Sequence, residues 1–298
     1  MELSQIEAFV AVTDTHSFSA AATQLHLTQP AVSRRIGQLE HALGQPMFDR
    51  LPSRVTLTDA GTAFLPFARR TLAAVQDGRA AVLASAGSLG GIVTLALVGT
   101  LAATDLTTRL KRFRDDAGHG HLKLRTALSV QVSQLVRNGT AQLGLRYFAD
   151  RHDDISSEQV GDEPLVVVAS GSRPTPNKTG LETILDATWV GFPASEDGQG
   201  FGNLLLRQLA AAGLGSSEVL EVDSLTAQKR MIEADFGVGL LPRSSVGEEL
   251  RLGTLQVLDA PQLRASLPIH LIQRRTTYVT PLMDRLSSVL RAPATGRS

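Results

Sequence analysis

The sequence contains no cysteine and few large aromatic side chains, with one tryptophan and two tyrosines among 298 residues. Without cysteine the chain forms no disulfide, carries no thiolate nucleophile and holds no metal through sulfur. No run reaches the roughly 18 apolar residues that span a bilayer. Residues 1–9 also lack the basic flank and apolar core of a signal peptide. We therefore expect a soluble, cytoplasmic protein with no membrane partner.

An excess of charge of one sign is missing as well, because 29 basic residues balance 29 acidic ones. This excludes a protein that holds nucleic acid through its overall charge, so any positive surface must be local. A small local surplus occurs between residues 34 and 70, where the only acids are Glu40, Asp49 and Asp59. The arginines of this stretch are Arg34, Arg35, Arg50, Arg54, Arg69 and Arg70.

The motifs of common enzymes are also absent. The chain has no Gly-x-Ser-x-Gly elbow, no phosphate-loop lysine motif and no His-Glu-x-x-His helix, and Gly198, Gly200 and Gly202 lack dinucleotide-loop spacing. His119 and His121 lack an evident third metal ligand. We predict that the protein is not an enzyme and holds no metal or cofactor. An enzyme stays the rival class, because α/β lobes with clefts host much catalysis.

What the chain does contain is a pair of short predicted helices near the N-terminus, joined by a very short turn. Ser19 can cap a helix over residues 20–25, and Thr28 can cap a second helix with Pro30 in its first turn. In the second helix apolar residues recur at i, i+4, i+7 and i+11, which predicts one buried stripe. The stripe consists of Val32, Ile36, Leu39 and Leu43.

The opposite face of this second helix is polar. In a DNA major groove, arginine pairs with guanine and glutamine with adenine. This favours base readout by Gln29, Ser33 and Arg34. The alternative is that the polar face only meets water, as in any amphipathic helix. The face comprises Gln29, Pro30, Ser33, Arg34, Gln38 and His41.

The flanking sequence favours the DNA-binding interpretation. An amphipathic first helix turns Leu3, Ile6, Phe9 and Val10 inward. The second of the paired helices should end at Gly44 and Pro46, and Met47 and Phe48 follow as an apolar plug.

Residues 50–57 then indicate a hairpin-like wing that turns at Pro52–Ser53, with Val55 and Leu57 inward. The wing arginines can reach phosphates or the minor groove. The candidate DNA contacts are Ser17, Ser19, Thr28, Gln29, Pro30, Ser33, Arg34, Gln38, Arg50 and Arg54.

This segment resembles the N-terminal pattern of the LysR-type transcriptional regulators, at fixed spacing and without a gap. The resemblance covers about the first quarter of the chain and continues through residues 57–61. It implies a winged helix-turn-helix that reads double-stranded DNA. The matching positions are Ser17, Phe18, Ala21, Ala22, Leu25, Gln29, Pro30, Ser33, Ile36, Leu39, Glu40, Leu43, Gly44, Phe48 and Arg50.

A long Ala-rich helix is expected next, from residue 59 to about residue 85, with Thr58 as its cap. The run 86–91 of small residues then suits a hinge. The apolar spacing fits an intramolecular core and a dimer interface equally well, and the family resemblance favours antiparallel pairing of two such helices. The stripe includes Phe64, Phe67, Ala68, Thr71, Leu72, Val75 and Val82.

Beyond the hinge, short apolar strands alternate with helices, which predicts an α/β fold with a largely parallel sheet. The expected strands are 92–98, 122–128, 141–147, 165–169, 189–192, 219–222, 238–241 and 269–274. The expected helices are 104–113, 130–138, 203–212, 225–234 and 281–290.

This order resembles the effector domain of the same family, a two-lobed unit similar to a type 2 periplasmic solute-binding protein. Asn138–Gly139, residues 221–224 and residues 237–242 carry the resemblance, although Gln142 stands where the family commonly has aspartate. A pure solute-binding protein is the alternative for this part alone. The expected domains are 1–58 (DNA binding), 59–88 (linker and hinge) and 89–298 (effector binding), with lobe I over 89–163 and 268–298 and lobe II over 164–267.

Ligands of open α/β sheets settle beyond the carboxyl ends of strands, beside helix N-termini. Three loops have such a position, at residues 99–101, 129–131 and 196–202. Phe148 and Arg146 can face the cleft between the lobes as well. As an alternative, these residues only cap helices and form turns. The candidate effector contacts are Gly99, Thr100, Leu101, Ser129, Val130, Gln131, Phe148, Gln199, Gly200 and Phe201.

The sequence therefore predicts a transcriptional regulator that binds an inverted repeat in promoter DNA and takes a small-molecule effector between its lobes. The family resemblance implies self-association into dimers and a tetramer. It also implies contact with RNA polymerase if the protein activates transcription.

Overall fold

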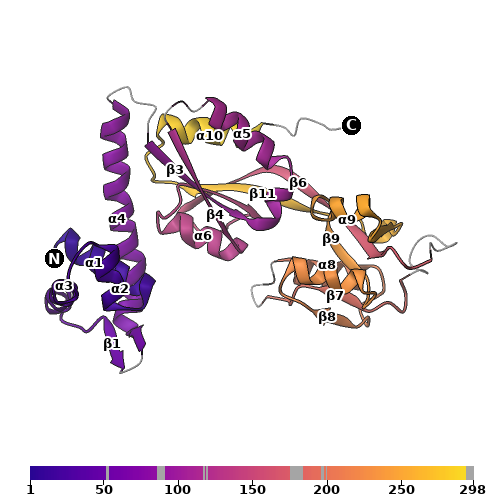
Figure 1. The fold of residues 1–298 in the computed structure, drawn as a ribbon, viewed down its shortest axis with the longest axis horizontal. Coiled ribbons are helices and arrows are strands. Elements are labelled where there is room, and N and C mark those ends of the chain that lie inside the picture. The colour runs from indigo at the N-terminus through magenta and orange to yellow at the C-terminus, as the bar shows by residue number, and fades with distance from the viewer. Residues whose placement is uncertain are drawn as a thin grey trace.

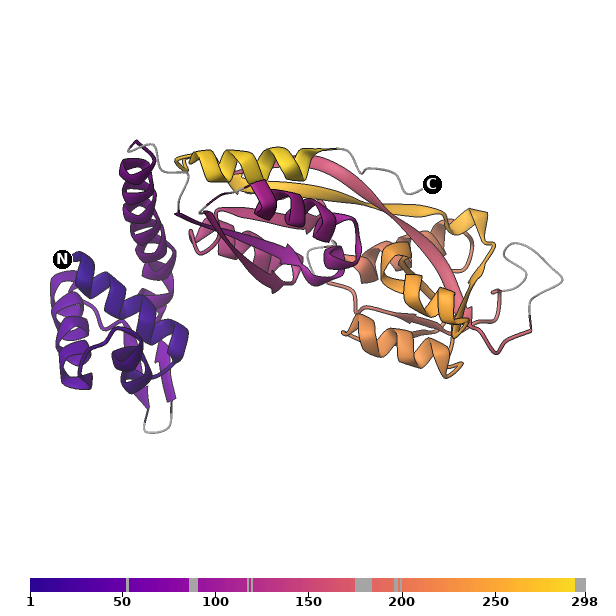
Figure 2. The same cartoon turned by 45° about the horizontal axis from the view of Figure 1, so that its top comes forward.

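The computed structural model describes residues 1–51, 54–85, 91–116, 118, 120–174, 184–195, 198 and 200–292. A small helical unit at the N-terminus joins a long helix, α4 (Asp59–Ser85), which leads to two α/β lobes (Figures 1 and 2). The predicted turn Pro52–Ser53, most of the hinge 86–91, His119 and Gln199 lie outside the described residues.

The N-terminal unit is a three-helix cluster with a two-stranded wing. Its helices are α1 (Leu3–Thr15), α2 (Phe18–Gln24) and α3 (Gln29–Leu43), and its antiparallel strands are β1 (Phe48–Leu51) and β2 (Arg54–Leu57). As predicted, α3 begins after Thr28 and ends at Gly44, whose φ of 71° is a left-handed conformation that favours glycine.

Three details of this unit differ from the sequence prediction. Thr28 occupies the N-cap position of α3, but its side chain makes no capping hydrogen bond. Ser17, rather than Ser19, caps α2, because its side chain accepts the N–H of Ala20 at 3.2 Å and Ser19 already lies inside the helix. Val32, Ile36 and Leu39 are buried as expected, but Leu43 is 37% exposed. Leu43 is the last residue of α3, directly before the stop at Gly44.

The core of the N-terminal unit gathers around Phe9. Its ring lies 5.4 Å from that of Phe48 and 5.3 Å from that of Phe64, so α1, the wing and α4 meet at one residue. Phe18 adds an edge contact to Phe48 at 5.8 Å. Offset and edge-on aromatic contacts of this kind add to the stabilisation from burial.

Helix α4 is shared between the N-terminal unit and lobe I. Thr58 caps it, because its hydroxyl accepts the N–H of Gly61 at 3.0 Å. Phe64, Ala68 and Leu72 pack into the N-terminal core, whereas Phe67 on the same helix is 59% exposed. The predicted stripe is therefore partly an intramolecular core.

The second half of α4 packs on lobe I. Gly139 lies so close to Ala73 that a Cβ at Gly139 would fall 2.0 Å from the Cβ of Ala73. One turn further on, the Arg274 guanidinium donates to Asp77 Oδ2 at 2.9 Å, and the Thr277 hydroxyl donates to the same oxygen at 3.0 Å. The Arg274 and Asp77 side chains are only 9% and 16% exposed.

The sequence predicted a largely parallel sheet, but the main sheet is mixed. Its order is β10-β6-β11-β5-β3-β4, with β9 also paired to β6. Only the β3–β4 and β3–β5 pairs are parallel, and every pair that involves β6 or β11 is antiparallel. The strands are β3 (Gly91–Val98), β4 (Gly120–Ala127), β5 (Leu143–Tyr147), β6 (Ile155–Ser170), β9 (Gly239–Pro242), β10 (Leu255–Leu258) and β11 (Ala265–Arg274).

Two long strands, β6 and β11, run side by side from one lobe to the other (Figure 2). Sequence reasoning found only their second halves, because Pro164 and Pro268 stand inside them and proline normally ends a strand. A register shift between Ile269 and His270 interrupts their pairing near the crossing. The expected lobe limits at 163/164 and 267/268 fall inside these strands and remain predictions.

The helices cover the sheet on both sides. In lobe I, α5 (Leu106–Asp116) and α10 (Pro281–Arg291) pack together on one face and α6 (Ser129–Arg137) covers the other (Figure 1). Lobe II adds a small parallel sheet, β7 (Trp189–Gly191) with β8 (Val219–Glu221). Its helices are α7 (Phe201–Ala211), α8 (Leu225–Glu233) and α9 (Gly247–Leu252).

We expect Ile36→Ala to lower the free energy of unfolding of the N-terminal unit by about 2–5 kcal/mol, because it leaves a cavity in a fully buried site. Leu43→Ala, on the same helix, should cost less than about 1 kcal/mol. Calorimetry of the full chain measures both. Equal losses would show that Leu43 is as well packed as Ile36.

Candidate functional site

The outward face of α3 is the first candidate site. Gln29, Pro30, Arg34, Gln38 and His41 are exposed along it, as the sequence predicted. The Gln29 amide donates to the Ser33 hydroxyl at 3.0 Å, so these two candidate base-reading groups lie together at the start of the helix. No ion pair holds the Arg34 guanidinium within the part of the chain that the structure describes.

The other candidates for DNA contact are less uniform. Ser17 serves as the α2 cap, Ser19 is exposed on α2, and Thr28 is exposed before α3. Arg50 belongs to strand β1 of the wing, and Arg54 belongs to strand β2. The structure thus places all ten predicted contacts on one small unit, with the base-reading set at the exposed end of α3.

The second candidate site is a cavity of about 840 Å³ between the two lobes. Lobe I contributes the turn after β3, the start of α6 and the end of β5, and lobe II contributes the start of α7 and part of α8. The predicted effector contacts that line it are Gly99, Thr100, Ser129, Val130, Gln131, Phe148, Gly200 and Phe201.

Leu101 is an error of the sequence prediction. It is 1% exposed and lines a different cavity, because the chain after β3 forms a tight turn, η1 (Gly99–Ala103), that directs Leu101 away from the interlobe cavity. Sequence reasoning also missed cavity residues from lobe II, because no local pattern marks them. They are Phe192, Pro193, Ser195, Asp223, Leu225, Thr226, Lys229 and Ser245.

Aromatic rings join the lobes beside this cavity. Tyr147 of lobe I packs edge-on against Phe201 of lobe II at 5.2 Å, and Phe192 lies 5.2 Å from Phe201. The Tyr147 and Thr100 hydroxyls are hydrogen-bonded at 2.9 Å. Phe148 adopts a φ of 61°, which is rare for a residue with a Cβ and turns the chain at the end of β5.

Arg146 is buried, and an internal acid already neutralises it. Its Nη1 donates to the Ser133 hydroxyl at 2.6 Å and to Asp150 Oδ2 at 3.2 Å, and its Nε donates to the Tyr147 carbonyl at 3.2 Å. Arg146 lines the interlobe cavity, as the sequence predicted, and the alternative of an exposed arginine at the end of a strand is wrong. Asp150 lies only four positions from Arg146, but the segment between them is not helical, so no i,i+4 pattern marked the pair; the turn at Phe148 brings the two side chains together.

The charge on Asp150 is stable in this setting. Burial raises the pKa of its carboxyl, but the hydrogen bonds from Ser133 and His152 and the charge of Arg146 outweigh burial and hold the pKa below its ordinary value. His270, behind this pair, has a pKa lowered by burial first and by Arg146 second, with Asp162 acting in the opposite direction. Asp150 is therefore ionised near neutral pH, and the uncharged form of His270 is favoured.

Lys229 is the second cation of the interlobe cavity and is also paired. Its Nζ lies 2.6 Å from Glu249 Oε1 and donates to the Ser245 carbonyl at 3.0 Å. The Lys229 and Glu249 side chains are both largely buried. Neither cation of this cavity thus carries an uncompensated charge.

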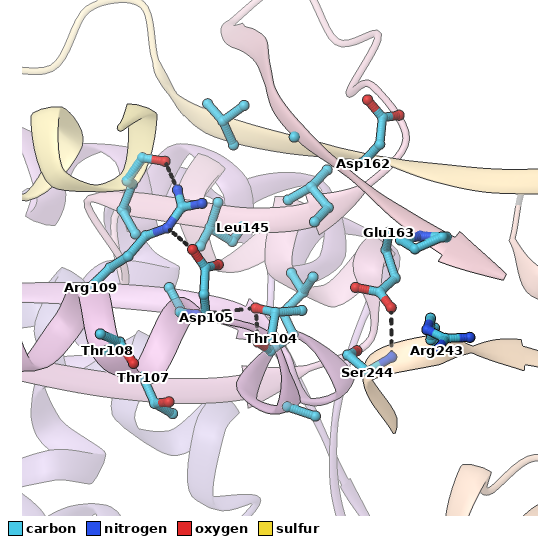
Figure 3. Close-up of a pocket in the computed structure, with 18 residues that line it drawn as sticks. Thr104, Asp105, Thr107, Thr108, Arg109, Leu145, Asp162, Glu163, Arg243 and Ser244 are labelled. Carbon is cyan, nitrogen blue, oxygen red and sulfur yellow. Dashed lines mark hydrogen bonds and ion pairs between the residues drawn. The ribbon is translucent and has the colours of Figure 1, made fainter. Parts of the chain in front are cut away.

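A further cavity, of about 1100 Å³, lies on the other side of η1 (Figure 3). Glu163 of β6 and Ser244 both line this cavity, and the Glu163 carboxylate accepts the Ser244 N–H at 3.0 Å. Arg109 is held there by Asp105 at 2.8 Å and by the Leu290 carbonyl at 2.9 Å. In this cavity, Arg109 thus connects α5 to α10, and Glu163 connects β6 to the turn that contains Ser244.

The described residues hold no cluster of three or more His, Asp or Glu side chains that could bind a metal ion. None of their helices is both long and apolar enough to cross a membrane.

Two family models match the chain and together cover most of it. Residues 3–62 match the model described as "Bacterial regulatory helix-turn-helix protein, lysR family", and residues 86–294 match the "LysR substrate binding domain". The first match contains the candidate DNA contacts, and the second contains both lobes.

Curated relatives match over nearly the full length. The chain is 30% identical to the HTH-type transcriptional regulator TfdS of Cupriavidus pinatubonensis over 298 residues, which covers 98% of this chain and 96% of that protein. It is 29% identical to the regulator CbbR of Rhodospirillum rubrum over 292 residues, again covering 98% and 96%.

Solved structures share the fold. The crystal structure of CbnR, a LysR family transcriptional regulator, has a TM-score of 0.73 at 24% identity and covers 99% of this chain and 100% of CbnR. Full-length OxyR from Pseudomonas aeruginosa has a TM-score of 0.75 at 21% identity, with coverage of 98% and 95%. The arrangement of a helical N-terminal unit and two α/β lobes therefore agrees with that of solved regulators.

The buried Tyr147 hydroxyl yields a prediction about alkaline pH. Burial, more than any other cause, raises the pKa of Tyr147 above its ordinary value near 10, against the opposing hydrogen bond from Thr100. Because the folded-state pKa is raised, the stability that neutral Tyr147 contributes is complete below pH 10 and is lost as the pH rises further.

In a Tyr278→Phe variant, Tyr147 is the one remaining tyrosine. Tyrosinate absorbance should then stay absent while the protein is folded at pH 10–11 and should appear together with loss of structure. A reversible titration with a midpoint near pH 10 in the folded state would contradict the buried position of this hydroxyl.

Proposed function

This chain belongs to the LysR family of bacterial helix-turn-helix transcriptional regulators, so it binds DNA, and we propose that it reads an inverted-repeat operator and responds to a small-molecule effector held between its lobes. The family and the curated relatives are regulators rather than enzymes, as the missing catalytic motifs predict. The proposal includes no cofactor besides the effector.

Base readout is assigned to the exposed end of α3. Gln29, Ser33 and Arg34 combine amide, hydroxyl and guanidinium groups on a helix that its buried stripe holds rigidly. Such groups match the donor and acceptor pattern of the major groove. CbnR, of the same fold, has been crystallised with its target DNA. Arg50 and Arg54 on the wing are assigned to the DNA backbone or minor groove.

Self-association is part of the proposal, because two recognition helices one helical turn apart read an inverted repeat. Phe67 and Val82 are large exposed apolar side chains on α4, at 59% and 70%, and they support pairing of two linker helices. A tetramer would then combine such dimers through the lobes. We assign the protein to the cytoplasm, with RNA polymerase as its partner if it activates transcription.

The effector site is assigned to the interlobe cavity. Its volume of about 840 Å³ falls in the range of small-molecule pockets, which is roughly 300–1,000 Å³. Both lobes line it, so a ligand that contacts both favours one arrangement of the lobes over another. This differential affinity is what a ligand needs in order to shift a conformational equilibrium.

We infer that a change in the arrangement of the lobes reaches the DNA-binding unit through β11. This strand passes between the lobes and ends at Arg274, which holds Asp77 of the linker helix. We assign transmission of the effector signal to this contact, supported by the close packing of Gly139 on Ala73.

Arg34→Ala should weaken specific DNA binding by roughly 1–3 kcal/mol and relax the preference at one base position. Selection of sites from random duplex DNA, followed by titration, measures both effects. Arg35→Ala is the matched control, because Arg35 reaches back to the Ser4 carbonyl at 3.5 Å and should leave base preference unchanged. Failure of the unmodified protein to enrich an inverted repeat would refute the proposed operator.

Asp77→Ala should free α4 from lobe I, because it leaves the largely buried Arg274 without its acceptor, at a cost of about 1–3 kcal/mol. Hydrogen exchange should then speed up at residues 73–79 and 272–277, while α1–α3 keep their protection. Asp14→Ala serves as control, since it removes the partner of Arg69 on the N-terminal half of α4. Unchanged exchange at both segments would exclude the contact as the connection.

A further inference from the structure

The charges around the interlobe cavity are arranged so that neither cation is left uncompensated. Arg146 faces Asp150, and Lys229 faces Glu249, as described above. Asp223, in the lobe II wall, is exposed and is engaged by no ion pair within the described part of the chain. These five groups sum to a net charge of −1.

Asp150 is the unusual member of this set, because its side chain is completely enclosed. Its Oδ2 faces Arg146 at 3.2 Å, and its Oδ1 accepts the backbone N–H of His152 at 2.9 Å and contacts the His152 ring at 2.7 Å. A carboxylate held by several donors stays ionised and cannot turn away to make room for a ligand carboxylate. Arg146 is thus neutralised from inside the protein.

Hydrogen-bond donors that face no acid are concentrated in the lobe I wall of the cavity. The Ser129 side chain and the first backbone N–H groups of α6 belong to it, with the positive end of the α6 dipole. Thr100 lines the same wall, with its hydroxyl bonded to Tyr147. This wall offers hydrogen bonds to one acceptor group or one anionic group.

The lobe II wall of the cavity carries apolar side chains and one exposed acid. Phe192, Phe201 and Leu225 line it together with Asp223, and Lys229, which also lines it, is already paired with Glu249. An aromatic or aliphatic body fits among these side chains. A second carboxylate would lose its hydration there and meet Asp223 instead of an unpaired cation, which is unfavourable.

Within the proposed function of this cavity, we infer that Asp150 determines the charge class of the effector. By neutralising Arg146 it makes the cavity select a ligand with an apolar ring and a single acceptor or anionic group over a dicarboxylate of the same shape. Asp150 acts through Arg146 and is a positioning and charge-compensating residue rather than a ligand contact.

A pair of small aromatic probes tests this inference on the full-length protein. 4-Methylbenzoate and terephthalate share the ring and one carboxylate, and they differ only in a para methyl group against a para carboxylate. Isothermal calorimetry should show 4-methylbenzoate binding at least about tenfold more tightly, because the second carboxylate of terephthalate has no available cation.

Two variants assign the selectivity to its cause. Asp150→Asn removes the negative charge that faces Arg146, so the preference for 4-methylbenzoate should shrink by at least about tenfold. Ser133→Ala is the matched control, because it removes the other side-chain partner of Arg146 without changing any charge, and it should keep the selectivity. Circular dichroism and the melting temperature establish that each variant is folded.

A third variant, Ser129→Ala, separates this inference from the proposed site itself. It should weaken both probes by a similar factor. Equal or tighter binding of terephthalate by the unmodified protein, or binding of neither probe, overturns the inference even if Asp150→Asn does not fold. Binding that Ser129→Ala leaves unchanged would instead show that the probes occupy another place and that the proposed effector site is wrong.

Discussion

The pairing of β6 with β11 is the constraint on which most of this structure depends. The two strands are hydrogen-bonded over most of their length and pass together from lobe I to lobe II. They are the longest hydrogen-bonded connection between the lobes that form the interlobe cavity. Prolines inside both strands and a register shift at the crossing weaken the ladder there, where a change in the angle between the lobes costs least.

Since β11 ends at Arg274, the same strand also determines where the DNA-binding unit is held. The buried contact with Asp77 and the packing of Ala73 on Gly139 attach α4 to lobe I, and Phe64 attaches the other half of α4 to the core around Phe9. One helix thus belongs to two hydrophobic units. A rotation of lobe I relative to α4 acts on a largely buried ion pair, Arg274–Asp77.

Acidic and basic groups are balanced at the cavity, as they are in the sequence as a whole. The chain has as many acidic as basic residues, and each cation that lines the cavity faces an acid from a neighbouring segment. In the proposed effector site, the N-terminus of α6 and the hydroxyl groups then remain to attract the ligand. On this proposal, the selectivity of the cavity depends on the lack of an unpaired cation as much as on the donors that are present.

Much of the N-terminal unit follows from the sequence by itself, because its helices, caps and stops depend on residues fewer than five positions apart. The buried positions of Ile36 and Leu39, the stop at Gly44 and the exposure of Arg34 were predictable from helical periodicity. The loops around Thr100 and Ser129 were predictable as cavity walls from the α/β pattern, whereas Leu101 was not, since the tight turn η1 directs it elsewhere.

Only the tertiary structure decided the direction of the strands and the partners of the charges. The antiparallel course of β6 and β11 depends on how distant segments of the chain meet, and prolines hid the first half of each strand from a local pattern. The pairings Arg146–Asp150, Lys229–Glu249 and Arg274–Asp77 leave no sequence signal, since a charged side chain finds its partner through the backbone that surrounds it. Local periodicity determines which face of a helix is buried, but the fold determines what each buried charge meets.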